Sequence, residues 1–210
     1  KFPNKIPIFP LSNFIIFPNT TVPLNIFEPR YIQMVDDCMK GNRLIGIVQP
    51  KKTGDLKKPN LYEVGCVGKI TSFNETEDGR YFIVLNGICR YKIVDELAND
   101  KLYRECKINF DNYINDLKEN NKEEIKFADL KLIFNDLKNL FRKQGYLINW
   151  KDLEKQTLYQ TINTLSMVSP FSLEEKQILL ETSTLVERKK KLEEILKTYI
   201  SGSFENTTLQ

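Results

Sequence analysis

The sequence predicts an α+β fold in which a β-rich half is followed by a helical half. Up to about Phe110, short runs rich in Val, Ile, Tyr and Phe are punctuated by Gly, Pro, Asn and Asp, a pattern typical of strands and turns. After Phe110, apolar residues recur at helical spacing. The chain has 210 residues, of which 41% are hydrophobic and 28% charged. This composition is that of a globular protein, and a chain of this length buries roughly 70% of its unfolded surface.

The first half contains five strand candidates, which are NRLIGIVQP, YEVGCVGKITSF, RYFIVLNG, CRYKIVDEL and LYRECKINF. Between the second and third, Asp78 and Gly79 supply the positive φ values of a tight hairpin turn. These two strands are therefore predicted to be antiparallel neighbours. Residues 51–60 carry four lysines, a glycine and a proline with almost nothing to bury, and are expected to form a solvent loop.

One helix is predicted to interrupt the β half. Pro29 fits its first position and Gly41 suits its end. The spacing predicts one buried face, made of Tyr31, Met34, Val35 and Cys38.

The helical half begins with a segment that is predicted to form one long helix ending near Gly145. Its apolar residues at helical spacing are Ile125, Phe127, Leu130, Ile133, Phe134, Leu137, Leu140 and Phe141. Two more helices are expected to begin at SLEE (172–175) and TLVE (184–187), which match the capping box. The last is expected to run to Ile200 and stop at Gly202. The expected organisation is a β domain over 1–112, a helical subdomain over 113–202 and a polar tail over 203–210.

Composition and motifs exclude several classes of enzyme. Histidine is absent, which removes every mechanism that needs an imidazole base or ligand. No glycine-rich loop ending in Lys-Ser or Lys-Thr occurs, so no phosphate-binding loop of an ATPase is present. The four cysteines form no CxxC pair and are expected to be reduced core residues. We therefore expect no metal, no cofactor and no catalytic residue.

Charged residues indicate no site either. The net charge is +3 and bases are interleaved with acids, which is too weak a pattern to predict nucleic-acid binding. The pairs at 36–37 and 123–124 are expected to face solvent, as is the charge run ERKKKLEE around Arg188. The longest apolar runs are far shorter than the ~20 residues of a membrane span. The first residues lack the apolar core of a secretory signal, so a cytoplasmic protein is expected.

Several motifs together resemble a known family. They are IPIFPLSNFIIFPNTTVPLNIFEPRY, MVDDCMKGNRLIGIV, YEVGCVGKITSFNETEDGRYFIVLNGICRYKI and YRECKINF, in this order over about the first 110 residues. This part resembles the amino-terminal substrate-binding domain of ATP-dependent Lon (La) proteases. The helical remainder, including MVSPFSLEEKQILLE, is similar to the continuation found in stand-alone bacterial forms that lack the ATPase and peptidase modules.

The resemblance implies a fold and a role. The fold is a PUA-like six-stranded β pseudo-barrel with one inserted helix, followed by a C-terminal helical bundle. The role is non-catalytic capture of unfolded or extended protein segments, with the chain acting as an adaptor in proteolysis or protein quality control. Its partners would then include a protease or chaperone, and no membrane. The alternative is an RNA-binding PUA-like protein, which the scattered charges disfavour. A hydrolase that uses only Ser, Lys, Asp or Glu is a third hypothesis.

The segment FPNTTVPLNIFEPRY (17–31) supplies most of the candidate peptide-binding residues. Its three prolines prevent it from being a central strand over its full length. Phe17, Leu24, Ile26 and Phe27 are interpreted as mostly core. Arg30 lies at the start of a helix and opposes its dipole, so it needs a partner, which is Glu28, an acid on another strand, or the carboxylate or carbonyl of a bound peptide. A peptide-binding module needs an open sheet edge or an apolar groove. The full candidate set is Phe14, Phe17, Phe27, Glu28, Arg30, Tyr31 and Tyr81.

Overall fold

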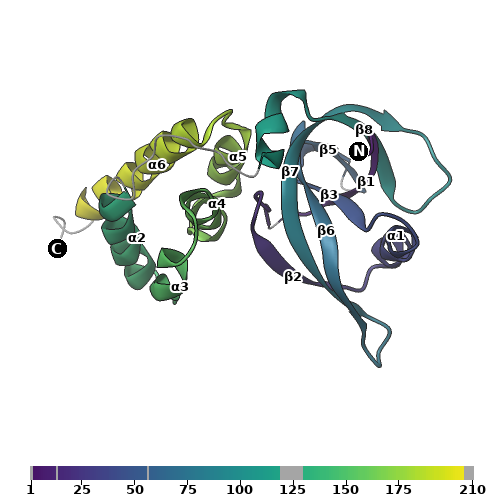
Figure 1. The fold of residues 1–210 in the computed structure, drawn as a ribbon, viewed down its shortest axis with the longest axis horizontal. Coiled ribbons are helices and arrows are strands. Elements are labelled where there is room, and N and C mark those ends of the chain that lie inside the picture. Colours follow the sequence, from purple (N-terminus) through teal and green to yellow (C-terminus); the bar gives the residue numbers. More distant parts are fainter. Residues whose placement is uncertain (1, 13, 56, 119–129, 206–210) are drawn as a thin grey trace. The chain divides into compact units, whose positions relative to one another are not determined.

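The chain divides into two compact units, unit 1 (Lys1–Glu119) and unit 2 (Asn120–Gln210). The computed structural model describes residues 2–12, 14–55, 57–118 and 130–205. Unit 1 holds all the strands of this described part, and the elements of unit 2 within it are helices (Figure 1). The predicted α+β class is confirmed.

The strands of unit 1 form one large sheet and one small one. They are β1 (Lys5–Pro10), β2 (Thr21–Ile26), β3 (Leu44–Val48), β4 (Pro50–Asp55), β5 (Lys58–Leu61), β6 (Val64–Glu75), β7 (Tyr81–Leu97) and β8 (Arg104–Asn109). Six of them pair in the order β2-β7-β6-β3-β1-β8, and a further pairing of β7 with β8 closes the sheet on itself. The β1–β3 pair is parallel and the other pairs are antiparallel.

Strand β7 makes this closure possible because it pairs first with β2 and then with β8 along its length. Its first half, Tyr81–Asn86, pairs with β2, and its second half, from Lys92 onward, pairs with β8. RYFIVLNG and CRYKIVDEL were predicted as two strands, and this was wrong. The chain continues through Gly87 as one 17-residue strand, with a register shift against β6 beside that glycine. A bulge of this kind bends a strand without ending it.

The two connections that were predicted around β6 had different outcomes. The β6–β7 hairpin is confirmed, with Gly79 at φ 77° and the Thr76 N–H donating to the Arg80 carbonyl at 2.9 Å. The solvent loop predicted at residues 51–60 was wrong, because most of that segment forms the antiparallel β4–β5 pair. Its side chains are mostly exposed, so apolar content carried no signal for these strands.

Helix α1 (Pro29–Met39) forms as predicted, with Pro29 in its first turn. Its buried residues are the predicted Tyr31, Met34, Val35 and Cys38, which join a core cluster with residues of five strands. Figure 1 shows α1 against the strands of unit 1. The helix ends at Met39, with Lys40 as its C-cap, so Gly41 lies just beyond it.

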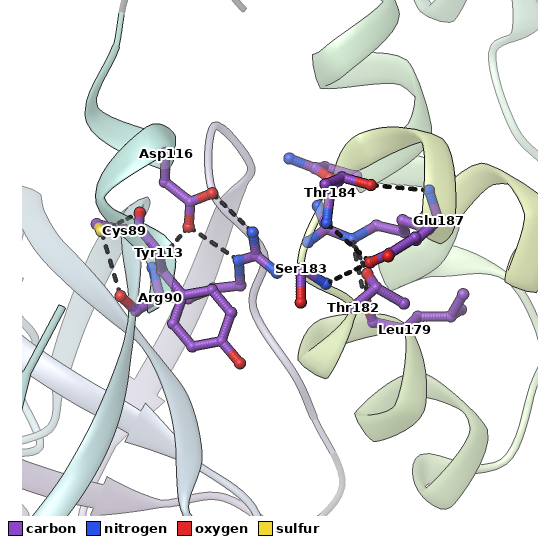
Figure 2. Close-up of polar contacts among 11 residues, drawn as sticks. Cys89, Arg90, Tyr113, Asp116, Leu179, Thr182, Ser183, Thr184 and Glu187 are labelled. Atoms are coloured by element: carbon purple, nitrogen blue, oxygen red, sulfur yellow. Dashed lines mark hydrogen bonds and ion pairs between the residues drawn. The ribbon is translucent and has the colours of Figure 1, made fainter. Parts of the chain in front are cut away.

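A buried ion pair fixes the end of unit 1. The short 3₁₀ segment η1 (Asp111–Leu117) carries Asp116, whose carboxylate accepts from Arg90 Nε at 2.9 Å, Nη2 at 2.8 Å and the backbone N–H at 3.0 Å. The two side chains are 3% and 2% exposed. The Arg90 guanidinium also lies 4.3 Å from the centre of the Tyr113 ring, which Figure 2 shows beside it. η1 is thereby held against β7.

Unit 2 contains α2 (Lys131–Lys143), α3 (Trp150–Glu154), α4 (Leu158–Val168), α5 (Leu173–Glu181) and α6 (Leu185–Glu205). The described part of the predicted long helix is α2, which buries Ile133, Phe134, Leu137, Leu140 and Phe141, while Ile125 and Phe127 lie outside the described residues. Helix α6 continues to Glu205, so the predicted stop at Gly202 was wrong, and residues 206–210 of the expected tail also lie outside.

Capping boxes begin the last three helices. Those predicted at Ser172–Glu175 and Thr184–Glu187 are confirmed by hydrogen bonds in both directions, and Figure 2 shows the second. A third box joins Thr157 to Gln160 at the start of α4. The letters TLYQ carry the same signal, and this helix start was not predicted.

Arg188 was predicted to lie on a solvated face, and this was wrong. Its side chain is 0% exposed. The guanidinium donates to the Leu179 carbonyl at 3.0 Å, to Thr182 Oγ1 at 3.2 Å and to Asn163 Oδ1 at 2.5 Å. The other charged residues of the run are exposed or part-buried, so Arg188 is the only charged position of the run that turns inward. It ties α6 to α4 and to the end of α5.

The four cysteines are free and buried, as predicted. Burial raises the pKa of the Cys38 thiol and that of the Cys89 thiol to about 12, which keeps both protonated. In the part of the chain that the structure describes, no helix has the length and apolar character needed to cross a membrane.

Candidate peptide-binding surface

Strand β2 leaves one edge of the sheet open. It pairs with β7 along its whole length, from Thr21 opposite Asn86 to Ile26 opposite Tyr81. Within the described residues no strand pairs with its other edge. An unpaired edge presents backbone donors and acceptors to which an extended chain can add.

The hydrogen bonds next to β2 show which of its backbone groups face outward. The Gly87 N–H donates to the Thr20 carbonyl at 2.8 Å, which makes Thr21–Asn86 a non-hydrogen-bonded pair. By alternation, Pro23 and Asn25 occupy the same kind of position. Thr21, Pro23 and Asn25 therefore direct their backbone groups away from β7. Pro23 lacks an N–H, so it is compatible with this edge and costs no bond to β7.

An exposed apolar strip runs beside this edge on the outer face of the sheet. The register places Pro23 opposite Val84 and Asn25 opposite Phe82, while Val22, Leu24 and Ile26 point to the core side. Phe82 is 44% exposed and Phe27, one residue after β2, is 64% exposed. We call Pro23, Phe27, Phe82 and Val84 the apolar strip.

Phe27 was interpreted as core, and the structure corrects this. The backbone alternates along β2, so the residue after buried Ile26 points to the opposite, outer side. The Arg80 guanidinium lies 5.9 Å from the centre of the Phe27 ring and pairs with Asp78 at 2.9 Å. Phe27 is thus available to a ligand in a way that a core residue is not.

Tyr81 lies on the other face of the same hairpin. Its ring meets Phe73 edge to face at 4.9 Å, and its hydroxyl donates to Asp36 on α1 at 2.9 Å. This hydrogen bond to Asp36, together with burial, raises the pKa of Tyr81 to about 12. Asp37 similarly accepts from the Tyr103 hydroxyl at 2.8 Å. The prediction that the pair 36–37 faces solvent was therefore incomplete, because both carboxylates anchor neighbouring elements to α1.

The remaining candidates do not gather on one surface. Phe17 is 0% exposed and Phe14 is part-buried against the core, so Phe17 offers no contact to a ligand. Tyr31 is buried, 4.2 Å from the Phe9 ring centre to centre. Arg30 pairs with Glu28, with Nη2 2.8 Å and Nε 2.9 Å from the same carboxylate oxygen. This is one of the partners that the sequence suggested.

Arg30 and Tyr31 line a cleft of about 200 Å³ in unit 1. The end of β1, the start of α1, the β4–β5 pair and the β7–β8 connection form its walls. Arg104 also lines it, held by Glu96 at 2.6 and 3.0 Å and by the Pro59 carbonyl at 2.8 Å. The Arg104 hydrogen bond lowers the pKa of Glu96 below its usual value, so this pair stays ionised at neutral pH.

Comparisons with known proteins decide the family. The family model described as ATP-dependent protease La (LON) substrate-binding domain matches residues 5–198. The chain belongs to this family. Its fold is also that of solved relatives: the Lon N-terminal domain protein of Xanthomonas campestris aligns with a TM-score of 0.65 at 19% identity, over 92% of this chain and 97% of that one. The N-terminal domain of the Mycobacterium avium complex Lon protease aligns with a TM-score of 0.62 at 16% identity, covering 92% and 98%.

Curated relatives of this LON substrate-binding domain are Lon proteases. That of Desulfosudis oleivorans is 28% identical over 199 residues, which is 91% of this chain and 24% of the relative. That of Cytophaga hutchinsonii is 30% identical over 110 residues, or 51% and 13%. The chain thus spans about a quarter of the first of these relatives.

The sequence analysis missed part of the candidate peptide-binding surface formed by the β2 edge and the apolar strip. Phe82 and Val84 were predicted to lie in a strand but were not named as site residues. The sequence does not show which face of a strand packs against the core. Pro23 did carry a signal, because a proline inside a strand favours an edge. Pro23 and Phe27 were therefore the residues from which the open edge could have been predicted.

Proposed function

We propose that this LON substrate-binding domain is a non-catalytic module that binds unfolded or extended segments of other proteins along the β2 edge and the apolar strip. The open edge of β2 carries this proposal. A bound segment would add as a further strand, and its main chain would bond to the outward groups of Thr21, Pro23 and Asn25. Such bonds are independent of side chains, so they suit a binder of many sequences.

The apolar strip would supply the preference for unfolded protein. In an added strand, alternate side chains lie on the outer face of the sheet, the face that carries Pro23, Phe82 and Val84. Apolar side chains that a folded protein buries would be removed from water there, at about 25 cal/mol per Å². Few pocket contacts and a short edge favour weak, broad affinity. The closed sheet of unit 1 is also consistent with the PUA-like type that the resemblance implies.

We further propose that capture serves proteolysis or protein quality control, with the chain as an adaptor for a protease or chaperone. The support is family membership, since the curated relatives are named Lon proteases. The relative from Desulfosudis oleivorans is about four times as long as its aligned part. The activity of the full-length relatives is therefore not attributed to this chain.

Replacing Phe82 by serine should weaken peptide binding without unfolding the protein. We expect the dissociation constant of a fluorescent, unfolded peptide, measured by anisotropy, to rise about fivefold to tenfold, because a half-exposed ring is lost from the contact surface. Since Phe82 is outside the core, the unfolding free energy should change by about 1 kcal/mol or less.

Val94→Ser is the matched control. Val94 is 53% exposed on the same strand, beyond the part that pairs with β2. It should bind as the unchanged protein does. Equal affinity for Phe82→Ser and the unchanged protein, or equal loss in both variants, would show that the apolar strip is not the binding surface.

A further inference from the structure

The cleft beside α1 has a one-sided charge. Three cationic side chains line it, Arg30, Lys57 and Arg104, and none of its lining residues is acidic. Arg30 and Arg104 are each balanced by a carboxylate, Glu28 and Glu96. Lys57 has no ion pair among the described residues: only its backbone N–H is engaged, donating to Asp55 Oδ1 at 3.0 Å. An anion that enters the cleft would therefore meet positive charge.

The cations come from three separate segments, which the fold brings together. Arg30 lies in the first turn of α1, Lys57 lies between β4 and β5, and Arg104 begins β8. Arg104 is fixed by its three bonds, so its position is set before any ligand arrives. Arg30 is half-exposed, with a side-chain exposure of 46%, and can exchange its carboxylate partner for another. A guanidinium is suited to that exchange because it binds carboxylates through paired N–H groups.

Apolar residues form part of the remaining wall, which also includes Ser12. Pro10, Pro59 and Leu102 line the cleft, and Leu102 is 63% exposed. Its backbone N–H donates to Gln33 on α1 at 2.9 Å, which holds this wall in place. A volume of about 200 Å³ is below the range of drug-sized sites and matches a single residue with its charged end.

We propose that this cleft binds the C-terminal carboxylate of an extended peptide, with the last side chain against Leu102 and the prolines. Cations beside an apolar wall fit a group in which a carboxylate and a side chain share one carbon atom. This inference rests on the proposed peptide binding and narrows it to segments that end in a free carboxylate. The cleft shares no residue with the apolar strip, so the two surfaces are separable by mutation.

The test compares one unfolded peptide that ends in Leu, prepared with a free carboxylate and as the C-terminal amide. Anisotropy should give a dissociation constant about tenfold higher for the amide, the loss expected for a charge-assisted contact. Lys57→Gln should raise the dissociation constant of the free acid about threefold and leave that of the amide unchanged. Glu28→Gln should lower it, because it releases Arg30 from its carboxylate.

The Glu28→Gln variant gives the most discriminating result, because the proposal predicts higher affinity for the free acid, and a damaged fold would not raise affinity. Equal binding of acid and amide, with both bound, would overturn the cleft proposal and leave peptide binding intact. Failure of both peptides to bind would overturn the proposed function as well. Competition by inorganic phosphate as strong as that by the free acid would show a general anion site, and would also overturn the proposal.

Discussion

Asp116→Asn should destabilise unit 1 by about 3 to 5 kcal/mol, the loss seen when one partner of a buried ion pair is removed. The substitution keeps the shape of the side chain but removes the negative charge that compensates Arg90, whose side chain is 3% exposed. Three hydrogen bonds to Arg90 depend on that carboxylate. Urea unfolding, followed through hydrogen exchange of amides in β7 and β8, measures the change.

Two further variants separate charge from shape at this site. Glu28→Gln removes a carboxylate from an exposed ion pair and should change stability by less than about 1 kcal/mol. The double change Arg90→Met with Asp116→Leu should recover most of the loss, because well-packed apolar residues often replace a buried pair at no cost. A small effect of Asp116→Asn alone would contradict the assignment of η1 as an anchored part of unit 1.

Gly87→Ala should destabilise unit 1 by about 3 kcal/mol, the upper end for an overpacked site. A Cβ atom at this position would lie 2.1 Å from the Phe17 carbonyl oxygen, which is backbone and has no rotamer to change. The turn that carries this carbonyl is itself fixed. Thr20 Oγ1 donates to the same oxygen at 2.6 Å, and the Asn19 N–H donates to the Gly87 carbonyl at 2.9 Å.

Gly68→Ala is the matched control, because Gly68 pairs directly with Gly87 across β6 and β7. There a Cβ would lie 3.4 Å from the Leu85 side chain, an ordinary contact, so the change should cost less than about 1 kcal/mol. Thermal unfolding of both variants gives the comparison. Equal stability of the two would mean that the turn 17–20 does not rest on Gly87 as described.

Features that depend on residues close together in the chain could be predicted from the sequence. The buried face of α1 follows from helical periodicity, and the capping boxes at Ser172 and Thr184 follow from pairs three residues apart. The β6–β7 hairpin follows from the conformational freedom of Gly79. Each of these predictions needed only residues close together in the chain, and each is confirmed.

The errors concern what distant segments supply. Phe27 reads as core, yet its exposure depends on which strand pairs with β2 and on which side. Arg188 reads as a solvated cation, yet Asn163, Leu179 and Thr182 provide acceptors that make its burial tolerable. The continuity of β7 through Gly87 depends on the turn packed on that glycine. None of these relations is local in sequence.

The sequence predicted the kind of surface in the candidate site better than it predicted the residues that form it. An open sheet edge was expected from the needs of peptide recognition, and the structure has one at β2. Of the candidate residues, Phe27 lies on the strip, while Glu28, Arg30 and Tyr31 lie at the start of α1 and Phe17 is in the core. The segment 17–31 is therefore core, edge strand and helix start in succession.

The most direct test of the central claim is the affinity of an unfolded peptide for Asn25→Pro compared with Asn25→Ala. Asn25 directs its N–H to the open edge, so proline there removes a donor from that edge and no bond to β7. Both variants remove the same side chain, and circular dichroism should show both folded. We predict at least about fivefold weaker binding for Asn25→Pro and unchanged binding for Asn25→Ala. Equal affinity of the two folded variants would contradict strand addition at β2.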